Sequence, residues 1–140
     1  MALAATHVVV VTNPEIAALT DAYALIKCLS KQPRCPSMHV AVNRVLEPGL
    51  GTMTFDRLAE VARRFSGCSL HYVGEVPDDP AVTHRRLGQE PLLVSHPECL
   101  TSRAIDAMLD AMTAQMSGLA AAMVTGDGVD ERMTSQLARW

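Results

Sequence analysis

The sequence predicts an α/β fold built on a parallel sheet of about three strands with flanking helices. Apolar runs of strand length, rich in valine, occur at residues 7–12, 38–45 and 70–76. Segments with apolar residues at helical spacing follow each of these runs. Strands that alternate with helices in this way form a parallel sheet with right-handed crossovers. Because the 140 residues show no internal repeat, we expect one folded domain.

The first strand, at residues 7–12, is continuously apolar, so we expect other elements to cover both of its faces. Asn13 is predicted to cap the next helix. Pro14 would take the first helical position, where a missing N–H costs nothing. This helix is expected to end near Lys31, because apolar residues recur at helical spacing up to that point: Ile16, Leu19, Tyr23, Ile26 and Leu29.

Proline and glycine mark the boundaries of the next elements. Residues 32–36 contain two prolines, and residues 46–52 are predicted to form a loop. The second helix is predicted through residues 55–65, with Asp56 in its first turn, where the helix dipole favours a negative charge. Gly67 is expected to end this helix before the third strand.

A short and a long helix are predicted after the third strand. Asp79 is expected to cap a short helix that begins at Pro80 and lasts to about Leu87. Residues 91–95 are predicted to be extended. The long helix then carries an apolar series and reaches about residue 123: Ile105, Met108, Leu109, Met112 and Met116.

These elements predict a folded unit over residues 1–123 and a flexible tail over residues 124–140. The composition excludes several function classes for this unit. The net charge is −3 with both signs interspersed, so we expect no nucleic-acid partner. The four cysteines lack a Cys-x-x-Cys pair and the five histidines lack metal-ligand spacing, which favours reduced thiols and no metal.

The sequence contains no feature that indicates a membrane. There is no run of 18 apolar residues, and the first eleven residues contain no lysine or arginine. Arg132 and Arg139 are the only cations after Arg103, and nearby acidic residues offset their charge. The sequence therefore does not predict a basic membrane anchor at the C-terminal end. We therefore expect a cytoplasmic location and no membrane partner.

Four segments follow one another in a fixed order along the chain: VVVVTNPEIAALTDAYALIK, HVAVNRV, LHYVGEVPDD, and an Ala-rich amphipathic helix after a proline. This order, over roughly residues 5–116, resembles the C-terminal half of the MinD/ParA-like deviant-Walker ATPase family. The stretch TDAYALIK is most similar to the flagellar branch, the FleN/FlhG-like regulators of flagellar number and placement. The resemblance implies the Rossmann-like C-terminal half of a P-loop ATPase domain.

The residues that hold phosphate in that family have no counterpart in this sequence. It contains no Gly-x-x-x-x-Gly-Lys-Ser/Thr loop, and none of its eight glycines is followed by lysine. In the family, this loop, the switch aspartate and the second metal-binding motif all precede the segment that the chain resembles. We therefore expect no catalytic residue and no ATP hydrolysis by this chain alone.

The resemblance assigns recognition of adenine to two short segments. Asn43 and Arg44 end the second strand, and Pro77 and Asp78 follow the third; in the family these positions line the adenine pocket. An asparagine amide can donate to and accept from a purine edge, and parallel sheets bind ligands at the carboxyl ends of their strands. Without the resemblance, Asn43 and Arg44 would simply end a strand and Asp78 would form a turn. With no phosphate site, we expect adenine nucleotides to bind weakly, if any cofactor binds.

The resemblance also implies a dimer or partner face. Asn13, Pro14 and Glu15 begin a helix that lies near the nucleotide-dependent dimer face in the family, and Thr20 and Asp21 follow on the same helix. In the family, a strand from the N-terminal half pairs with the equivalent of the first strand. Here that edge would be bare, so we expect a homodimer through this edge, a separate polypeptide on it, or a rearranged terminus.

These inferences leave three hypotheses about function. The first is a non-catalytic regulatory or interaction module, derived from a MinD-like flagellar ATPase, with flagellar assembly proteins as partners. The second is one part of a split or truncated ATPase that hydrolyses ATP only with the missing N-terminal half. The third is an unrelated α/β protein that binds another planar ligand near Asn43 and Pro77.

Overall fold

The computed structural model describes residues 5–125 and contains three parallel strands in the order β1-β2-β3. The strands are β1 (His7–Thr12), β2 (Ser37–Val45) and β3 (Leu70–Pro77). The helices are α1 (Ile16–Ser30), α2 (Leu50–Ser66), α3 (Pro80–Thr83), α4 (Leu92–Ser95) and α5 (Leu100–Thr125). The predicted α/β class is confirmed, and each strand lies within one residue of its expected bounds.

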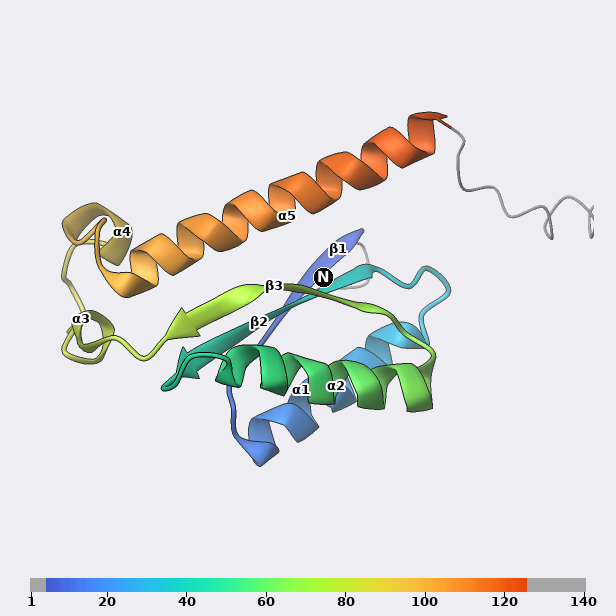
Figure 1. Ribbon diagram of the computed structural model, residues 1–140, viewed down its shortest axis with the longest axis horizontal. Helices are drawn as coiled ribbons and strands as arrows, with labels where there is room; N and C mark the ends of the chain where they lie inside the picture. The colour runs from blue at the N-terminus through green and yellow to red at the C-terminus, as the bar shows by residue number, and fades with distance from the viewer. Residues whose placement is uncertain (1–4, 126–140) are drawn as a thin grey trace, which may run out of the picture.

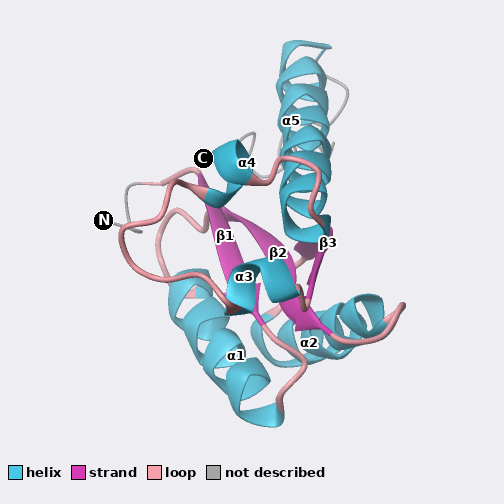
Figure 2. Ribbon diagram, turned by 90° about the vertical axis from the view of Figure 1, so that its left-hand side faces the viewer, coloured by secondary structure: helices cyan, strands magenta, loops and turns pink. Residues whose placement is uncertain are grey.

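The sheet separates two unequal layers of helix. α1 and α2 cover one face, and α5 lies against β3 on the opposite face (Figures 1 and 2). The apolar core fills the space between the sheet and the α1/α2 layer, and burial of its aliphatic side chains holds these five elements together. Leu70 and Tyr72 of β3 pack against it, and its most completely buried members come from the other four elements: Val10, Ile26, Met38, Val40, Val42, Leu58 and Ala62.

The first strand is covered on one face only, so the expectation of two covered faces is wrong. Val10 and Thr12 are buried on the side of α1, whereas Val9 and Val11 on the other side are 42% and 63% exposed. The physical reason is the position of α5, which packs over β3 at the far side of the sheet. Among residues 5–125, β1 also pairs with β2 alone, so its second edge has no strand beside it.

The start of α1 differs from the sequence prediction. The helix begins at Ile16, with Glu15 as the flanking residue and no side-chain cap. Asn13 does not cap the helix; its Oδ1 accepts a hydrogen bond from the backbone N–H of Glu15, two residues on, at 3.3 Å. Asn13 therefore forms a local turn, and Pro14 lies in that turn rather than in the first position of the helix.

Three further boundaries move. α2 begins at Leu50, so residues 50–52 are helical and Asp56 lies beyond the first turn. α3 ends at Thr83 rather than near Leu87, and residues 92–95, expected to be extended, form α4. Two predicted end signals are confirmed: Gly67 takes a left-handed conformation (φ 64°) at the end of α2, and Asp79 caps α3.

The last helix is the longest element of the fold. α5 has 26 residues, which corresponds to about 39 Å, and it projects past the edge of the sheet (Figure 1). Within residues 5–125, neither α5 nor any other helix is both long and apolar enough to cross a bilayer. The helix reaches Thr125, two residues past its expected end, and the rest of the predicted tail, residues 126–140, lies outside the described residues.

Candidate functional site

A cavity of about 360 Å³ lies at the carboxyl ends of the strands, where α3 and the start of α5 close over the sheet. All four residues that the family resemblance assigned to base recognition line it: Asn43, Arg44, Pro77 and Asp78. Val11 and Ala41 add side chains from β1 and β2. The parallel topology explains this convergence, because the ends of neighbouring parallel strands meet at one edge of the sheet.

The polar rim of this cavity depends on an irregular end of β2. The pairing of β2 with β3 shifts between Val42 and Val45, and Arg44 takes a left-handed conformation with φ 56°. The Oδ1 of Asn43 accepts the Arg44 N–H at 2.9 Å, and the Val45 carbonyl accepts the Asp78 N–H at 2.9 Å. This bulge turns the Asn43 and Arg44 side chains into exposed positions beside the third strand.

Arg44 and Asp78 form the one ion pair within the described residues. The Arg44 Nε lies 3.8 Å from Asp78 Oδ1, and the two side chains are 65% and 33% exposed. A pair this open to water contributes little stability, between zero and about 1 kcal/mol. Both groups therefore stay available to a ligand.

Asp79 holds the far wall of the cavity in place. The residue is 6% exposed, and its carboxylate accepts two backbone N–H groups, from Ala81 at 2.8 Å and from Thr101 at 3.0 Å. These hydrogen bonds, from Thr101 first and then from Ala81, lower the pKa of Asp79. One side chain thus fastens the starts of α3 and α5 together. The sequence indicated the first bond but not the second, which spans 22 residues.

The remaining wall is apolar and comes mainly from α3 and α5. Val82, Ile105 and Met108 face the cavity. Gly74 in β3 permits the approach of α5, since a Cβ at this position would lie 2.7 Å from the Met108 Cγ. Apolar walls with a polar rim of amide, guanidinium and carboxylate groups suit a planar, hydrogen-bonding ring. Within residues 5–125, no three His, Cys, Asp or Glu side chains are grouped to hold a metal ion.

Of the five residues predicted for a dimer or partner face, four line three separate hollows. Pro14 and Glu15 line a hollow of about 160 Å³ that also touches Arg44. Thr20 lines an apolar groove between α1 and α2. Asp21 borders a third hollow, of about 350 Å³, beside the open edge of β1. Asn13 lines none of these hollows.

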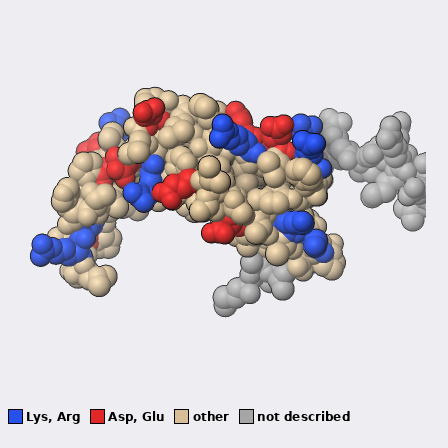
Figure 3. All heavy atoms as spheres, turned by 90° about the horizontal axis from the view of Figure 1, so that it is seen from below, with Lys and Arg blue, Asp and Glu red and all other residues tan. Residues whose placement is uncertain are grey.

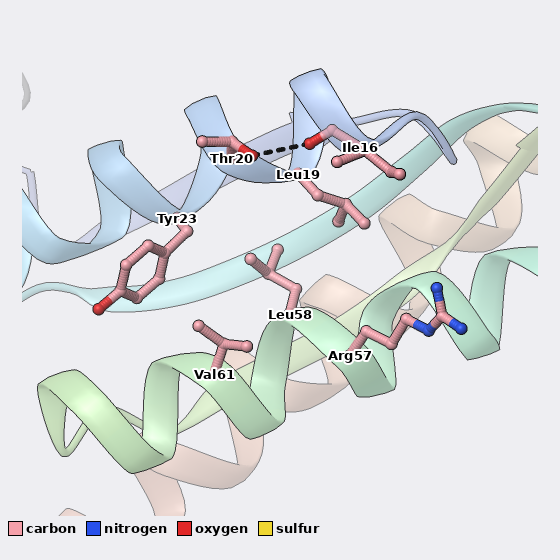
Figure 4. A pocket seen from close by; sticks show the side chains of 7 residues that line it. All are labelled: Ile16, Leu19, Thr20, Tyr23, Arg57, Leu58 and Val61. Atoms are coloured by element: carbon pink, nitrogen blue, oxygen red, sulfur yellow. Dashed lines mark hydrogen bonds between the residues drawn. The ribbon is translucent and has the colours of Figure 1, made fainter.

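The groove between α1 and α2 was not found from the sequence. It has a volume of about 290 Å³, and Ile16, Leu19 and Tyr23 of α1 face Leu58 and Val61 of α2 across it (Figure 4). Arg57 stands at one end, and the Thr20 hydroxyl donates to the Ile16 carbonyl at 2.8 Å. Charges of both signs are interspersed on the face of the molecule that is seen from below (Figure 3).

The chain is similar in sequence to two flagellar proteins. Over 105 residues, 75% of the chain, it is 33% identical to the antiactivator FleN of Pseudomonas aeruginosa. Over 100 residues, 71% of the chain, it is 34% identical to the flagellum site-determining protein YlxH of Helicobacter pylori. The chain is related to the FleN/FlhG-like flagellar regulators. This relationship confirms the resemblance drawn from the four ordered segments.

The matched region covers only part of the length of these two proteins. The chain spans 38% of the length of FleN and 33% of the length of YlxH. No family model matches the chain.

Proposed function

We propose that this chain is a FleN-like regulatory interaction module that has no catalytic activity of its own. The observation that carries the proposal is the 33–34% identity with two flagellar proteins, one named an antiactivator and the other site-determining. The cavity at the strand ends and the groove between α1 and α2 supply a ligand site and a protein site. The 140 residues contain no Gly-x-x-x-x-Gly-Lys-Ser/Thr motif, which supports binding rather than hydrolysis in this proposal.

In this proposal, the cavity holds adenine and is indifferent to phosphate. The Asn43 amide would bond the purine edge, Pro77 would form a fixed wall, and Arg44 and Asp78 would close the rim. Val82 and Met108 would pack on the face of the ring. Because the described residues that line the cavity include no lysine to hold a triphosphate, adenosine and ATP should bind equally weakly.

Calorimetry with adenosine and with ATP tests the adenine site. We expect comparable, weak affinities, and Asn43→Ala should weaken both by about 0.5–1.5 kcal/mol, the net value of one hydrogen bond. Asn13→Ala is the matched control, because Asn13 lies outside the cavity. Much tighter binding of ATP than of adenosine, or equal binding by Asn43→Ala, would contradict the assignment.

The groove between α1 and α2 is the proposed docking site for a flagellar regulatory protein. Ile16 is 84% exposed and Val61 37% exposed, so the groove offers apolar surface that a partner would cover. Arg57 at its end favours an acidic group on the partner. We therefore propose that the occupant is an amphipathic segment with apolar anchors and a carboxylate near Arg57.

Binding assays with purified flagellar regulatory and assembly proteins test the docking site. We expect at least one of them to bind the chain, and the double substitution Ile16→Glu, Val61→Glu should abolish that binding. Leu87→Glu is the matched control, because Leu87 is equally apolar, fully exposed and outside the groove. Failure of every such protein to bind the native chain would overturn the proposed function.

The open edge of β1 is the proposed site of self-association. The strand carries neither a charged residue nor proline along its six positions, so nothing in it opposes pairing. Antiparallel pairing of two copies through this edge would give a twofold dimer with a continuous sheet. Light scattering coupled to gel filtration should show the dimer, and a stable monomer at high micromolar concentration would argue against it.

The alternative function is one part of an ATP-hydrolysing assembly. The observation that favours it is the span of the match, which is only 38% of FleN and 33% of YlxH. Mixing the chain with a polypeptide that carries a phosphate-binding loop and measuring ATP turnover distinguishes the two functions. Turnover that appears only in the mixture supports the alternative.

A further inference from the structure

Three histidines lie side by side across the sheet on the face that carries α5. They are His7 of β1, His39 of β2 and His71 of β3, and the His39 ring centroid is 5.3 Å from each of the other two. His39 is fully buried, His7 is partly buried and His71 is exposed. A buried histidine at the centre of such a row has to satisfy both of its ring nitrogens inside the protein.

The hydrogen bonds of His39 join the sheet to the middle of α5. Gln115 of α5 donates its Nε2–H to the Tyr72 carbonyl at 3.2 Å, which leaves its Oε1 as an acceptor. The Nδ1 of His39 lies 3.1 Å from that oxygen, so Nδ1 carries the hydrogen. The Nε2 of His39 is then the acceptor, and the Nδ1 of His7 lies 3.1 Å away as its donor. This assignment of tautomers follows from the network.

This network is satisfied by a neutral His39. A second proton would place an N–H on Nε2, so that His7 would have to change tautomer, or the Ser37 hydroxyl oxygen at 3.4 Å would have to accept. Burial lowers the pKa of His39, and the nearby His71 and His7 rings lower it further, while Gln115 opposes the shift. The groups that face the ring are His7 from β1, His71 from β3, Ser37 from β2 and neutral Gln115 from α5. None of them is a carboxylate that could balance the charge of the imidazolium.

We propose that His39 is a proton-sensitive latch for α5. The neutral ring lies buried beneath the middle of the helix, which Gln115 fastens to the sheet through His39 and Tyr72. A protonated ring would keep its bond to Gln115 but would have no counter-charge in this buried position, so protonation favours release of the segment, which lets water reach the ring. The beginning of α5 has a separate anchor, the hydrogen bond from Thr101 to the Asp79 carboxylate. The middle of α5 would therefore separate from the sheet, while the first turn of the helix stays attached through Asp79.

The latch would control the candidate cavity. Ile105 and Met108, which form part of its apolar wall, lie on α5 between the Thr101 anchor and Gln115. Movement of this stretch would open the wall and weaken any ligand held against it. The inference does not depend on which ligand the cavity takes, because it concerns the attachment of α5 to the sheet.

Hydrogen exchange of the native chain at about pH 7.5 and about pH 5.5, on either side of the ordinary histidine pKa, tests the latch. After correction for the chemical exchange rate, protection of residues 108–117 should fall by up to about tenfold per pH unit below pH 6.5, as expected for uptake of one proton on opening. α1 should keep its protection over the same range. Equal loss in α1 and α5 would mean general acid unfolding and would overturn the proposal.

Two substitutions separate the latch from other effects of acid. His39→Leu removes the titrating group and should abolish the pH dependence, whereas His84→Gln, at an exposed histidine outside the row, should leave it intact. Gln115→Glu places a carboxylate against His39, which favours the protonated ring and should shrink or reverse the loss of protection on acidification. An unchanged pH dependence in either His39→Leu or Gln115→Glu overturns the proposal, and Gln115→Glu decides the matter if His39→Leu does not fold.

Discussion

Asp79 connects two helices that are far apart along the chain but adjacent in the fold. Its two carboxylate oxygens accept from Ala81 at the start of α3 and from Thr101 at the start of α5. Both acceptors meet N–H groups that the helices themselves leave unpaired, and the helix dipoles favour the negative charge there. At the scale of single residues, this is the contact that shapes the candidate cavity most directly.

Loss of the Asp79 charge should destabilise the protein in a pH-dependent way. Hydrogen bonding lowers the pKa of Asp79 in the folded state. The stability that the ionised carboxylate contributes is therefore complete above the ordinary pKa of about 3.8 and is lost as the pH falls through the folded-state pKa. Asp79→Asn should therefore lower the Tm at pH 7 and reduce the loss of Tm between about pH 5 and about pH 3. Asp78→Asn, at a more exposed carboxylate, serves as the control and should leave both quantities nearly unchanged. Equal Tm values for the native chain and Asp79→Asn at pH 7 would contradict this role.

Gly74 has a different role, which is to leave room for α5. Its φ of 137° disfavours side chains, and an added Cβ would lie 2.7 Å from the Met108 Cγ. Gly74→Ala should lower the free energy of unfolding by about 1–3 kcal/mol, measured by urea denaturation. Gly88 also has a left-handed φ, of 89°, but an added Cβ there would meet no atom within 4 Å. Gly88→Ala therefore measures the backbone strain alone and should lower the free energy of unfolding by less. A smaller cost for Gly74→Ala than for Gly88→Ala would show that α5 does not need the glycine.

At the scale of elements, α1 shows how a single helix divides its apolar residues between the core and an exposed groove. Ile26 is fully buried against the sheet, while Ile16, ten residues earlier on the same helix, is 84% exposed. Helical periodicity identified both as apolar positions of α1. Only their packing distinguishes them, because Ile26 belongs to the apolar core whereas Ile16, in the first turn of the helix, lines the open groove between α1 and α2.

This difference predicts unequal costs for the same substitution at two sites on α1. Ile26→Ala should lower the free energy of unfolding by about 2–5 kcal/mol, because it removes buried methylene groups and leaves a cavity. Ile16→Ala should change it by less than about 0.5 kcal/mol. Urea denaturation of both variants checks the pair. Similar values for the two would mean that Ile16 is covered in solution, as it would be in an oligomer that uses the α1–α2 groove.

At the scale of the whole molecule, one flank of the sheet lies open. The free edge of β1, the exposed faces of Val9 and Val11, and the half-exposed Leu25 of α1 surround a hollow of about 350 Å³. An uncharged edge of this kind pairs readily with another strand. The open flank therefore predicts self-association of the chain. The α1–α2 groove, on the other side of α1, is the proposed site for a different protein.

A charge on this flank should block self-association without unfolding the chain. Val11 is 63% exposed, so Val11→Lys should change the free energy of unfolding of the monomer by less than about 0.5 kcal/mol. It should nevertheless shift the molecular mass measured by light scattering from dimer to monomer. Leu87→Lys, at an exposed position away from β1, should leave the dimer intact. A dimer that persists in Val11→Lys would place the interface elsewhere.

The sequence by itself determined the three parallel strands, the helices between them and the convergence of Asn43, Arg44, Pro77 and Asp78. The strands and helices depend on local periodicity and on turn residues, which operate over a few residues. The four residues were picked out by the family resemblance, and they converge because neighbouring parallel strands end at a common edge. Only the tertiary structure decided which face of β1 is covered, that Asp79 reaches α5, and that His39 lies between His7 and Gln115. The reason is separation along the chain: the contacts of Asp79 and His39 with α5 span 22 and 76 residues, and no local pattern records which distant helix will pack against a strand.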